Sequence, residues 1–107
     1  HPQIATVGQT ERDLKAQGVN YIAHSQPYGS TAYGWAMEDD HGCCTVICDP
    51  DTRLLLGAHI IGHEASLLIQ QLVLGMRFGL TVDEMATSPL YIHPALSEVV
   101  EQALLEL

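Results

Sequence analysis

Short apolar stretches, each bounded by glycine, proline or turn residues, occur at four places in the chain and predict four β-strands. They are residues 4–8, 21–25, 42–48 and 54–61. The third and fourth stretches flank Asp-Pro-Asp-Thr, a composition typical of a tight turn. We therefore expect these two strands to pair as an antiparallel hairpin.

Helical patterns fill much of the remaining chain. Thr10 and Thr81 are suitable N-caps for two short helices. The first is expected to end near Gly18 and the second at Met85. Residues 64–78 are apolar nearly all round, which is typical of a helix buried on more than one side and predicts a partner surface. A last helix carries its apolar residues on one stripe: Leu96, Val99, Val100, Ala103, Leu104 and Leu107.

The whole chain, residues 1–107, fits a single domain. Strands that precede helices and pair antiparallel predict an α+β fold, an antiparallel sheet with helices packed on one side. Because the first residue is His and the opening strand begins almost at once, we interpret the domain as a fragment of a longer protein.

The charge balance narrows the possible partners. A net charge of -9 comes from 13 acidic and 4 basic residues, which disfavours nucleic acid and anionic membrane surfaces. The longest apolar stretch, residues 67–74, is far shorter than the ~20 residues of a membrane span. The three cysteines are crowded together, unlike those of a secreted disulfide scaffold, which indicates a reducing cytoplasm.

Cys43 and Cys48 have a spacing that could suggest a redox pair. On an extended strand, however, residues an odd number apart face opposite sides, and five steps cover roughly 17 Å. A disulfide requires Cα atoms within roughly 7 Å of each other. We therefore interpret both as small apolar strand residues.

Two groups of side chains could suggest a metal site: His41 with Cys43 and Cys44, and His59 with His63 and Glu64. The helical spacing of zinc-binding histidine pairs is not secured, because His59 lies in a predicted strand and His63 precedes a helix. Structural or surface histidines are the simpler interpretation, and we predict no metal site. No Gly-x-Gly-x-x-Gly turn occurs, so the chain has no dinucleotide-binding turn of its own.

His93 and Glu98 form the remaining candidate pair, at the start of the last helix. In one interpretation Pro94 begins the helix and Glu98 is a solvated residue near its favourable N-terminus. In the other, a carboxylate beside an imidazole nitrogen fixes the tautomer and makes a general acid–base group. Spacing alone leaves both open, and the second requires another domain to complete the site.

Three blocks carry a resemblance to a known family: HPQIATVGQTERDL, GAHIIGHEASLLIQQ and SPLYIHPALSEVVEQALL, in that order. Together they resemble the C-terminal dimerisation (interface) domain of the FAD-dependent pyridine nucleotide–disulfide oxidoreductases, over essentially the whole chain. Within the family, the loop sequences are most similar to those of the reductases of mycothiol disulfide. Dihydrolipoyl dehydrogenases, mercuric reductases and soluble transhydrogenases are the alternatives.

The resemblance implies a homodimer in which His93 reaches into the partner subunit's site and exchanges protons with redox cysteines and a leaving thiol, while Glu98 holds its ring. The backbone at His93 and Pro94 would touch the partner's flavin. FAD and NADPH would be bound mainly by domains of the same chain that are absent here, and the substrate would be a low-molecular-weight disulfide. Cys43 and Cys48 are not the counterparts of the family's redox pair, so the fragment alone is expected to be inactive. A dimerisation module without a chemical role is the competing hypothesis.

Overall fold

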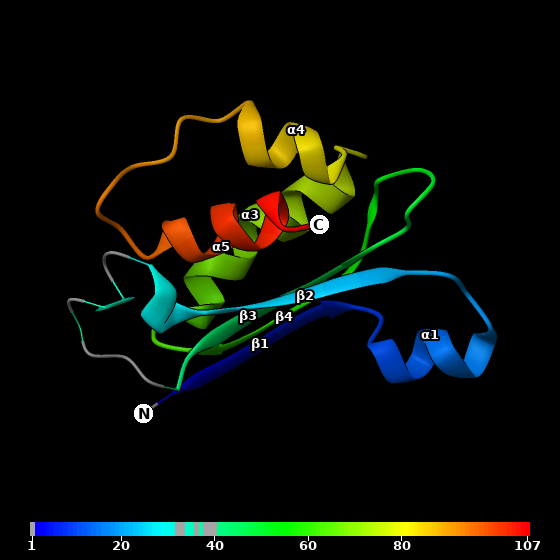
Figure 1. The fold of residues 1–107 in the computed structure, drawn as a ribbon, viewed down its shortest axis with the longest axis horizontal. Coiled ribbons are helices and arrows are strands. Elements are labelled where there is room, and N and C mark those ends of the chain that lie inside the picture. The colour runs from blue at the N-terminus through cyan, green and yellow to red at the C-terminus, as the bar shows by residue number, and fades with distance from the viewer. Residues whose placement is uncertain (1, 32–33, 36, 38–40) are drawn as a thin grey trace.

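The computed structural model describes residues 2–31, 34–35, 37 and 41–107 (Figure 1). Its elements are, in chain order, β1 (Gln3–Gly8), α1 (Glu11–Gln17), β2 (Ile22–Pro27), the 3-10 turn η1 (Tyr28–Ser30), β3 (Cys43–Cys48), β4 (Leu55–Gly62), α3 (Ala65–Arg77), α4 (Val82–Thr87) and α5 (Ser97–Leu105). Each strand lies where the pattern of apolar stretches predicts one, with ends that differ by one or two residues.

The four strands form one antiparallel sheet in the order β1-β4-β3-β2. The predicted hairpin is confirmed: β3 pairs with β4, with Val46 opposite Ala58. The carboxylate of Asp49 closes the connecting turn by accepting hydrogen bonds from the main-chain N–H groups of Asp51 and Thr52. Strand β1 pairs with β4 and not with its neighbour in sequence, so the two ends of the sheet are formed by β1 and β2.

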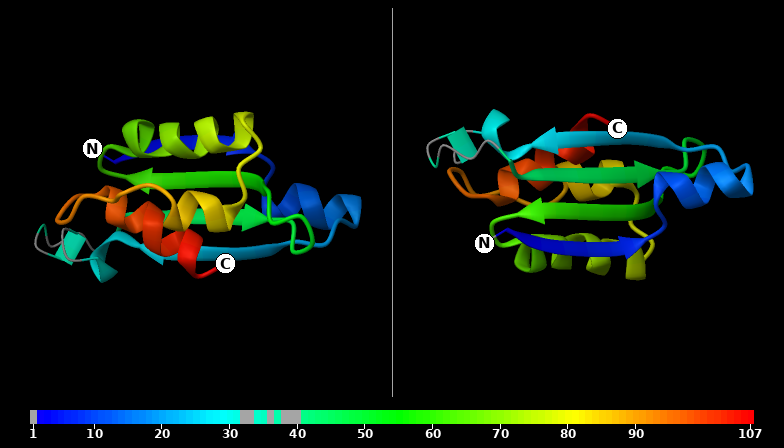
Figure 2. Two further views of the ribbon diagram at one scale, coloured as in Figure 1. Left: turned by 90° about the horizontal axis from the view of Figure 1, so that it is seen from above. Right: turned by 90° about the horizontal axis from the view of Figure 1, so that it is seen from below.

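Helices α3, α4 and α5 lie on one side of the sheet (Figure 1). Helix α3 contacts β1 and β4, α5 contacts β2 and β3, and α4 packs against α5. The views from above and below show that the described residues form no helical layer on the opposite side of the sheet (Figure 2). This arrangement confirms the predicted α+β class, with helices on one side of an antiparallel sheet.

The short helices begin and end with the capping residues that the sequence predicts. Thr10 and Asp13 form a reciprocal capping box on α1, which ends at Gly18 in the left-handed conformation. Helix α1 extends beyond the end of the sheet and does not cover it (Figure 1). Thr81 and Glu84 form a second capping box, and α4 continues to Thr87, slightly past the predicted end.

The hydrophobic core lies between the sheet and α3, α4 and α5. Alternate strand residues point into it, as the two-residue period of a strand requires. Its central members are Cys44, Val46, Ala58, Ile60, Leu72, Val99 and Val100, all at most 1% exposed. Burial of each aliphatic side chain of this size stabilises the fold by about 1.5–3 kcal/mol.

Helix α3 buries one side and exposes the other. Leu68, Ile69 and Leu72 face the core, whereas Leu67 and Leu74 are 70% and 54% exposed. The sequence correctly marks this helix as apolar on more than one side, but the described residues cover only its inner side. What covers the outer side stays a prediction.

Helix α5 begins at Ser97, three residues after Pro94, where the sequence suggests its start. Residues 93–96 bend into the helix instead, and hydrogen bonds from Glu98 N to the Ala95 carbonyl and from Val99 N to the Leu96 carbonyl join this turn to α5. The consequence is that His93 lies in the loop before the helix and not on it. Within the described residues, no helix has the length and apolar character needed to cross a lipid bilayer.

Candidate functional site

The loop that carries His93 is anchored by Tyr91. The Tyr91 hydroxyl donates a hydrogen bond to the Met85 carbonyl and accepts one from Gln71 Nε2, both at 2.9 Å. One side chain thus connects residues 88–96 to both α3 and α4. Burial raises the pKa of Tyr91, the Gln71 hydrogen bond lowers it, and the charge of Glu101 raises it. Sequence analysis gave no sign of this anchor, because a tyrosine in a loop has no distinctive pattern.

Glu98 is at the centre of the site. Its Oε2 accepts a hydrogen bond of 2.9 Å from the main-chain N–H of Ala95, and its Oε1 lies 3.3 Å from His93 Nδ1. The two contacts tie the turn and the imidazole to the first turn of α5. Both residues that the sequence singles out therefore lie in contact.

The burial of Glu98 argues against the simpler of the two interpretations. Its side chain is 3% exposed, whereas a solvated helix residue would face water. A buried carboxylate needs compensating partners, and the Ala95 N–H and the His93 ring are positioned to provide them. The imidazole itself is 51% exposed, so it is held from one side and open on another.

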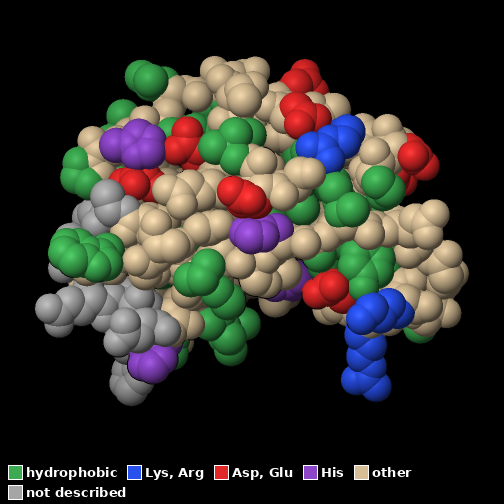
Figure 3. Space-filling model, viewed as in Figure 1, with side chains coloured by type: hydrophobic (Ala, Val, Ile, Leu, Met, Phe, Trp, Pro, Cys, Tyr) green, Lys and Arg blue, Asp and Glu red, His purple; other side chains and the backbone are tan. Residues whose placement is uncertain are grey.

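Glu101 also contacts His93, a contact that the sequence analysis missed. Its Oε1 lies 3.0 Å from Nε2 of the imidazole, and its side chain is 22% exposed. Glu98 and Glu101 are three residues apart on α5 and so share one face of the helix. That spacing is the signal that could have identified the second carboxylate. Figure 3 shows a histidine beside acidic side chains at the upper left of the view.

Pro94 is exposed next to His93, and the peptide bond between them is cis. Leu90 and Ile92 of the same loop are 90% and 63% exposed. The loop therefore presents two apolar side chains and an imidazole outward, at one edge of the helical layer (Figure 1). Such a surface can contact another molecule, because its backbone and side chains are accessible.

The cysteines are divided between the two faces of the sheet, as their spacing predicts. Cys44 and Cys48 are in the core, whereas Cys43 lies on the opposite face, and all three are free thiols. Burial raises the pKa of Cys44 to about 12 and also raises that of Cys48. Since Cys43 and Cys44 point to opposite faces, they cannot bind one metal ion together with His41.

The other histidine group is also dispersed. His59 Nε2 is 2.9 Å from the Gln9 carbonyl, while His63 contacts the neighbouring Glu64 at 3.8 Å on the surface. Across the described part of the chain, no cluster of three or more His, Cys, Asp or Glu side chains could hold a metal ion.

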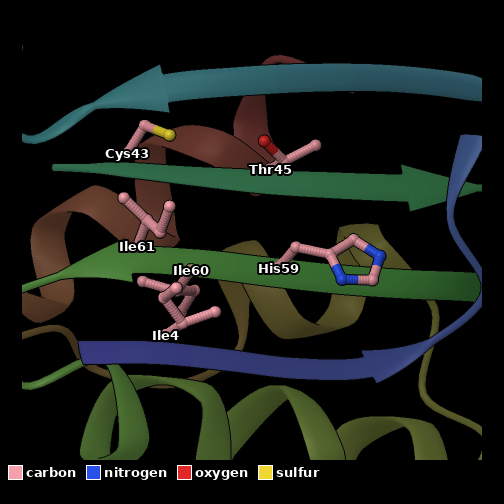
Figure 4. Close-up of a pocket in the computed structure, with 6 residues that line it drawn as sticks. All are labelled: Ile4, Cys43, Thr45, His59, Ile60 and Ile61. Carbon is pink, nitrogen blue, oxygen red and sulfur yellow. The ribbon is translucent and has the colours of Figure 1, made fainter.

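The open face of the sheet has a shallow depression of about 160 Å³. Figure 4 shows Cys43 and Thr45 from β3 and His59 and Ile61 from β4 around it, with Ile4 from β1. Its lining is mainly apolar and it has no convergent charged groups. It is therefore a poor candidate for chemistry, and the site around His93 remains the candidate.

Comparison of the chain with known proteins identifies its family. Residues 1–104 match the family described as "Pyridine nucleotide-disulphide oxidoreductase, dimerisation domain". The chain belongs to this family. The resemblance carried by the three sequence blocks is thus confirmed, and the parent proteins of such domains are disulfide oxidoreductases.

Two relatives are similar to this dimerisation domain over nearly its whole length. A mycothione reductase of Mycobacterium tuberculosis is 54% identical over 106 residues, which are 99% of this chain and 23% of that protein. Dihydrolipoyl dehydrogenase 2 of Haloarcula marismortui is 37% identical over 102 residues, 95% of this chain and 21% of that protein. The chain therefore spans about a quarter or less of the length of either relative.

Solved structures share the fold of this dimerisation domain. The crystal structure of LpdA from Mycobacterium tuberculosis superposes with a TM-score of 0.90 at 27% identity, covering 98% of this chain and 23% of that one. The flavoprotein disulfide reductase RclA of Escherichia coli gives a TM-score of 0.88 at 21% identity, covering 99% and 25%, and shows the fold alone.

Proposed function

We propose that this domain contributes His93 as the acid–base group of an intact, homodimeric, FAD-dependent disulfide reductase, with Glu98 orienting the imidazole. One observation carries the proposal: a carboxylate that is 3% exposed lies 3.3 Å from Nδ1 of an imidazole that is 51% exposed. A ring oriented by a buried carboxylate and half exposed to the outside suits proton exchange with a group on another subunit.

Disulfide reduction requires such a group. A thiolate attacks one sulfur, and the other sulfur leaves as a thiolate that needs a proton. An imidazolium stabilises the attacking thiolate and can protonate the leaving one. In this proposal Nε2 of His93 serves the partner subunit's thiols, while Glu98 holds Nδ1 and stabilises the charged ring.

The residues present fit a contact with a flavin and not a complete binding site for one. His93 and Pro94 are exposed in a loop, so their backbone can lie against a flat ring. The sequence contains no glycine-rich turn for a pyrophosphate. We therefore assign FAD and NADPH to domains of the same chain outside residues 1–107. When bound there, the flavin would supply electron transfer from the nicotinamide to the disulfide.

We propose mycothiol disulfide as the substrate and the cytoplasm as the compartment. The proposal is supported by the 54% identity to a mycothione reductase, against 37% to a dihydrolipoyl dehydrogenase. A panel of mycothiol disulfide, glutathione disulfide and lipoamide, assayed with the intact enzyme and with NADPH or NADH, tests this choice. Preferred turnover of lipoamide would contradict it.

The test of His93 uses the full-length enzyme and the His93→Gln substitution. Stopped-flow absorbance should show flavin reduction by NADPH at the rate of the unsubstituted enzyme and disulfide turnover slower by about a hundredfold or more. The control is His63→Gln, which removes an exposed imidazole that also contacts a glutamate. Unchanged turnover in His93→Gln would make the domain a dimerisation module without a chemical role.

A further inference from the structure

The imidazole of His93 is flanked by two carboxylates, and the proposed function uses only one of them. Glu98 Oε1 lies 3.3 Å from Nδ1, and Glu101 Oε1 lies 3.0 Å from Nε2. In the proposed function, Nε2 is also the nitrogen that exchanges a proton with a thiol. The role of Glu101 therefore bears directly on the proton that this nitrogen carries.

The two contacts involve both nitrogens of the ring. A neutral imidazole has one N–H and one lone pair, whereas the imidazolium has two N–H groups. If only one nitrogen were protonated, the other would turn its lone pair toward a carboxylate oxygen at 3.0 or 3.3 Å. When each nitrogen carries a proton, both carboxylates can accept a hydrogen bond from the ring, so the pair of contacts complements the imidazolium.

The surroundings add no other cation to compete for these carboxylates. Among the residues that the structure describes, His93 is the only basic side chain in contact with Glu98 or Glu101. The charge of Glu101 also raises the pKa of the Tyr91 hydroxyl in the loop. The contact of Glu101 with a basic side chain in the described structure is the one with His93.

We propose that Glu101 is a second positioning residue, which stabilises the proton on Nε2 of His93 until a leaving thiolate takes it. The proposal rests on the proposed acid–base role of His93. In the step, a thiolate forms a new S–S bond as the old one breaks, and the leaving thiolate accepts the Nε2 proton and becomes a thiol. The ring is then neutral and keeps its remaining proton on Nδ1, toward Glu98.

Glu101 also favours return of the proton. After the transfer, the lone pair of Nε2 faces the carboxylate at 3.0 Å, an unfavourable arrangement. Taking a proton from the next thiol to be deprotonated restores the ion pair. Because Glu101 is more exposed than Glu98, its side chain can turn aside to admit a thiol, while Glu98 stays fixed by Ala95.

The experiment compares Glu101→Gln with Glu106→Gln in the full-length enzyme. The glutamine keeps the size of the side chain and an oxygen that can accept from Nε2–H, but it carries no charge. The control removes the charge of an exposed glutamate from the end of the same helix. The measured quantities are flavin reduction by NADPH, kcat/KM for the disulfide as a function of pH, and dimer mass by light scattering.

For Glu101→Gln we expect kcat/KM for the disulfide to fall about fivefold at neutral pH, as for the loss of one partly exposed ion pair. The alkaline limb of the profile should move to lower pH, since the substitution removes a negative charge 3.0 Å from Nε2. Flavin reduction, dimer mass and the Glu106→Gln control should match the unsubstituted enzyme.

Three results would overturn the proposal. A Glu101→Gln profile that matches the unsubstituted enzyme, while His93→Gln is impaired, removes Glu101 and leaves the proposed function intact. An equal loss at every pH, slower flavin reduction or a smaller dimer mass makes Glu101 a structural residue. If His93→Gln turns over normally, the proposed function and this inference fail together.

Discussion

The main-chain N–H of Ala95 donates a hydrogen bond of 2.9 Å to Glu98 Oε2, so a carboxylate of α5 holds the turn in front of that helix. Replacing Glu98 by Ala leaves this N–H and the His93 ring without their acceptor. We expect the free energy of unfolding to fall by about 2 kcal/mol in denaturant titrations. Glu98→Gln should lose less, because its amide oxygen can still accept from Ala95.

Glu106 provides the control for that substitution. It is exposed at the end of the same helix, so Glu106→Ala should change stability by less than about 0.5 kcal/mol. Equal stability of Glu98→Ala and Glu106→Ala would show that the buried carboxylate does not support the turn.

Tyr91→Phe removes one hydroxyl and breaks two hydrogen bonds, to the Met85 carbonyl and from Gln71 Nε2. The expected loss is about 1 kcal/mol, with faster amide hydrogen exchange in residues 88–96. Tyr21→Phe is the matched control, since the described structure gives the Tyr21 hydroxyl no hydrogen bond. Unaltered exchange in the loop would mean that the phenol does not anchor it.

The same tyrosine predicts a dependence of stability on alkaline pH. Its pKa is raised in the folded chain, so the unfolded chain loses the phenolic proton first as the pH rises past about 10. The unfolded state then binds fewer protons, and the stability that Tyr91 contributes decreases until the pH passes its folded pKa. Unfolding curves at pH 9 and 11 should show this extra decrease, and the Tyr91→Phe curves should lack it.

The cysteines should react in a fixed order with a thiol reagent such as 5,5′-dithiobis(2-nitrobenzoate). Cys43 is partly exposed on the open face and should be labelled in the folded chain. Cys44 and Cys48 are buried and their thiol pKa values are raised, so they should react only on unfolding. Peptide mapping by mass spectrometry identifies the labelled residue, and early modification of Cys44 would contradict the packing of β3.

Asp83 should stabilise the chain only while its carboxylate is charged. Its two oxygens accept hydrogen bonds of 3.0 and 2.9 Å from the Arg53 guanidinium, which lowers the pKa of Asp83. The contribution is present above the unfolded pKa and is lost as the pH falls through the lowered folded pKa. Asp83→Asn should therefore be less stable at pH 7 and equal to the unsubstituted chain near pH 2. A constant difference over this range would contradict the ion pair, and Asp51→Asn in the turn is the control.

The sequence predicts the local elements well because their signals are local. The turn between β3 and β4 is formed by residues with strong turn preferences, and Thr10 and Thr81 both form capping boxes. The pairing of β1 with β4 has no such signal, since residues 3–8 carry nothing that specifies contact with residues 55–62. Long-range order of this kind follows from packing against α3, which contacts both strands.

The site is less predictable than the fold for the same reason. Polarity places Glu98 off the apolar stripe of the last helix and suggests that it faces solvent, yet it is buried because it binds the turn before the helix. Glu101 is the second carboxylate that contacts His93, and this contact depends on how the loop folds back onto α5. The sequence proposes the pair of His93 and Glu98 and places Glu101 on the same helix face, but only the fold of the loop shows that both carboxylates reach the ring.

The position of β1 at the edge beside β4 bears on how the chain is made. Strand β2 pairs with β3, and β3 pairs with β4, so each of these strands has its partner next to it in chain order. They can therefore pair in sequence as they leave the ribosome. Strand β1 is made before these three and has no β4 to pair with until residues 55–62 have emerged. Until then β1 has unpaired main-chain groups and an apolar Ile4 on its outward face, which favour association with other chains.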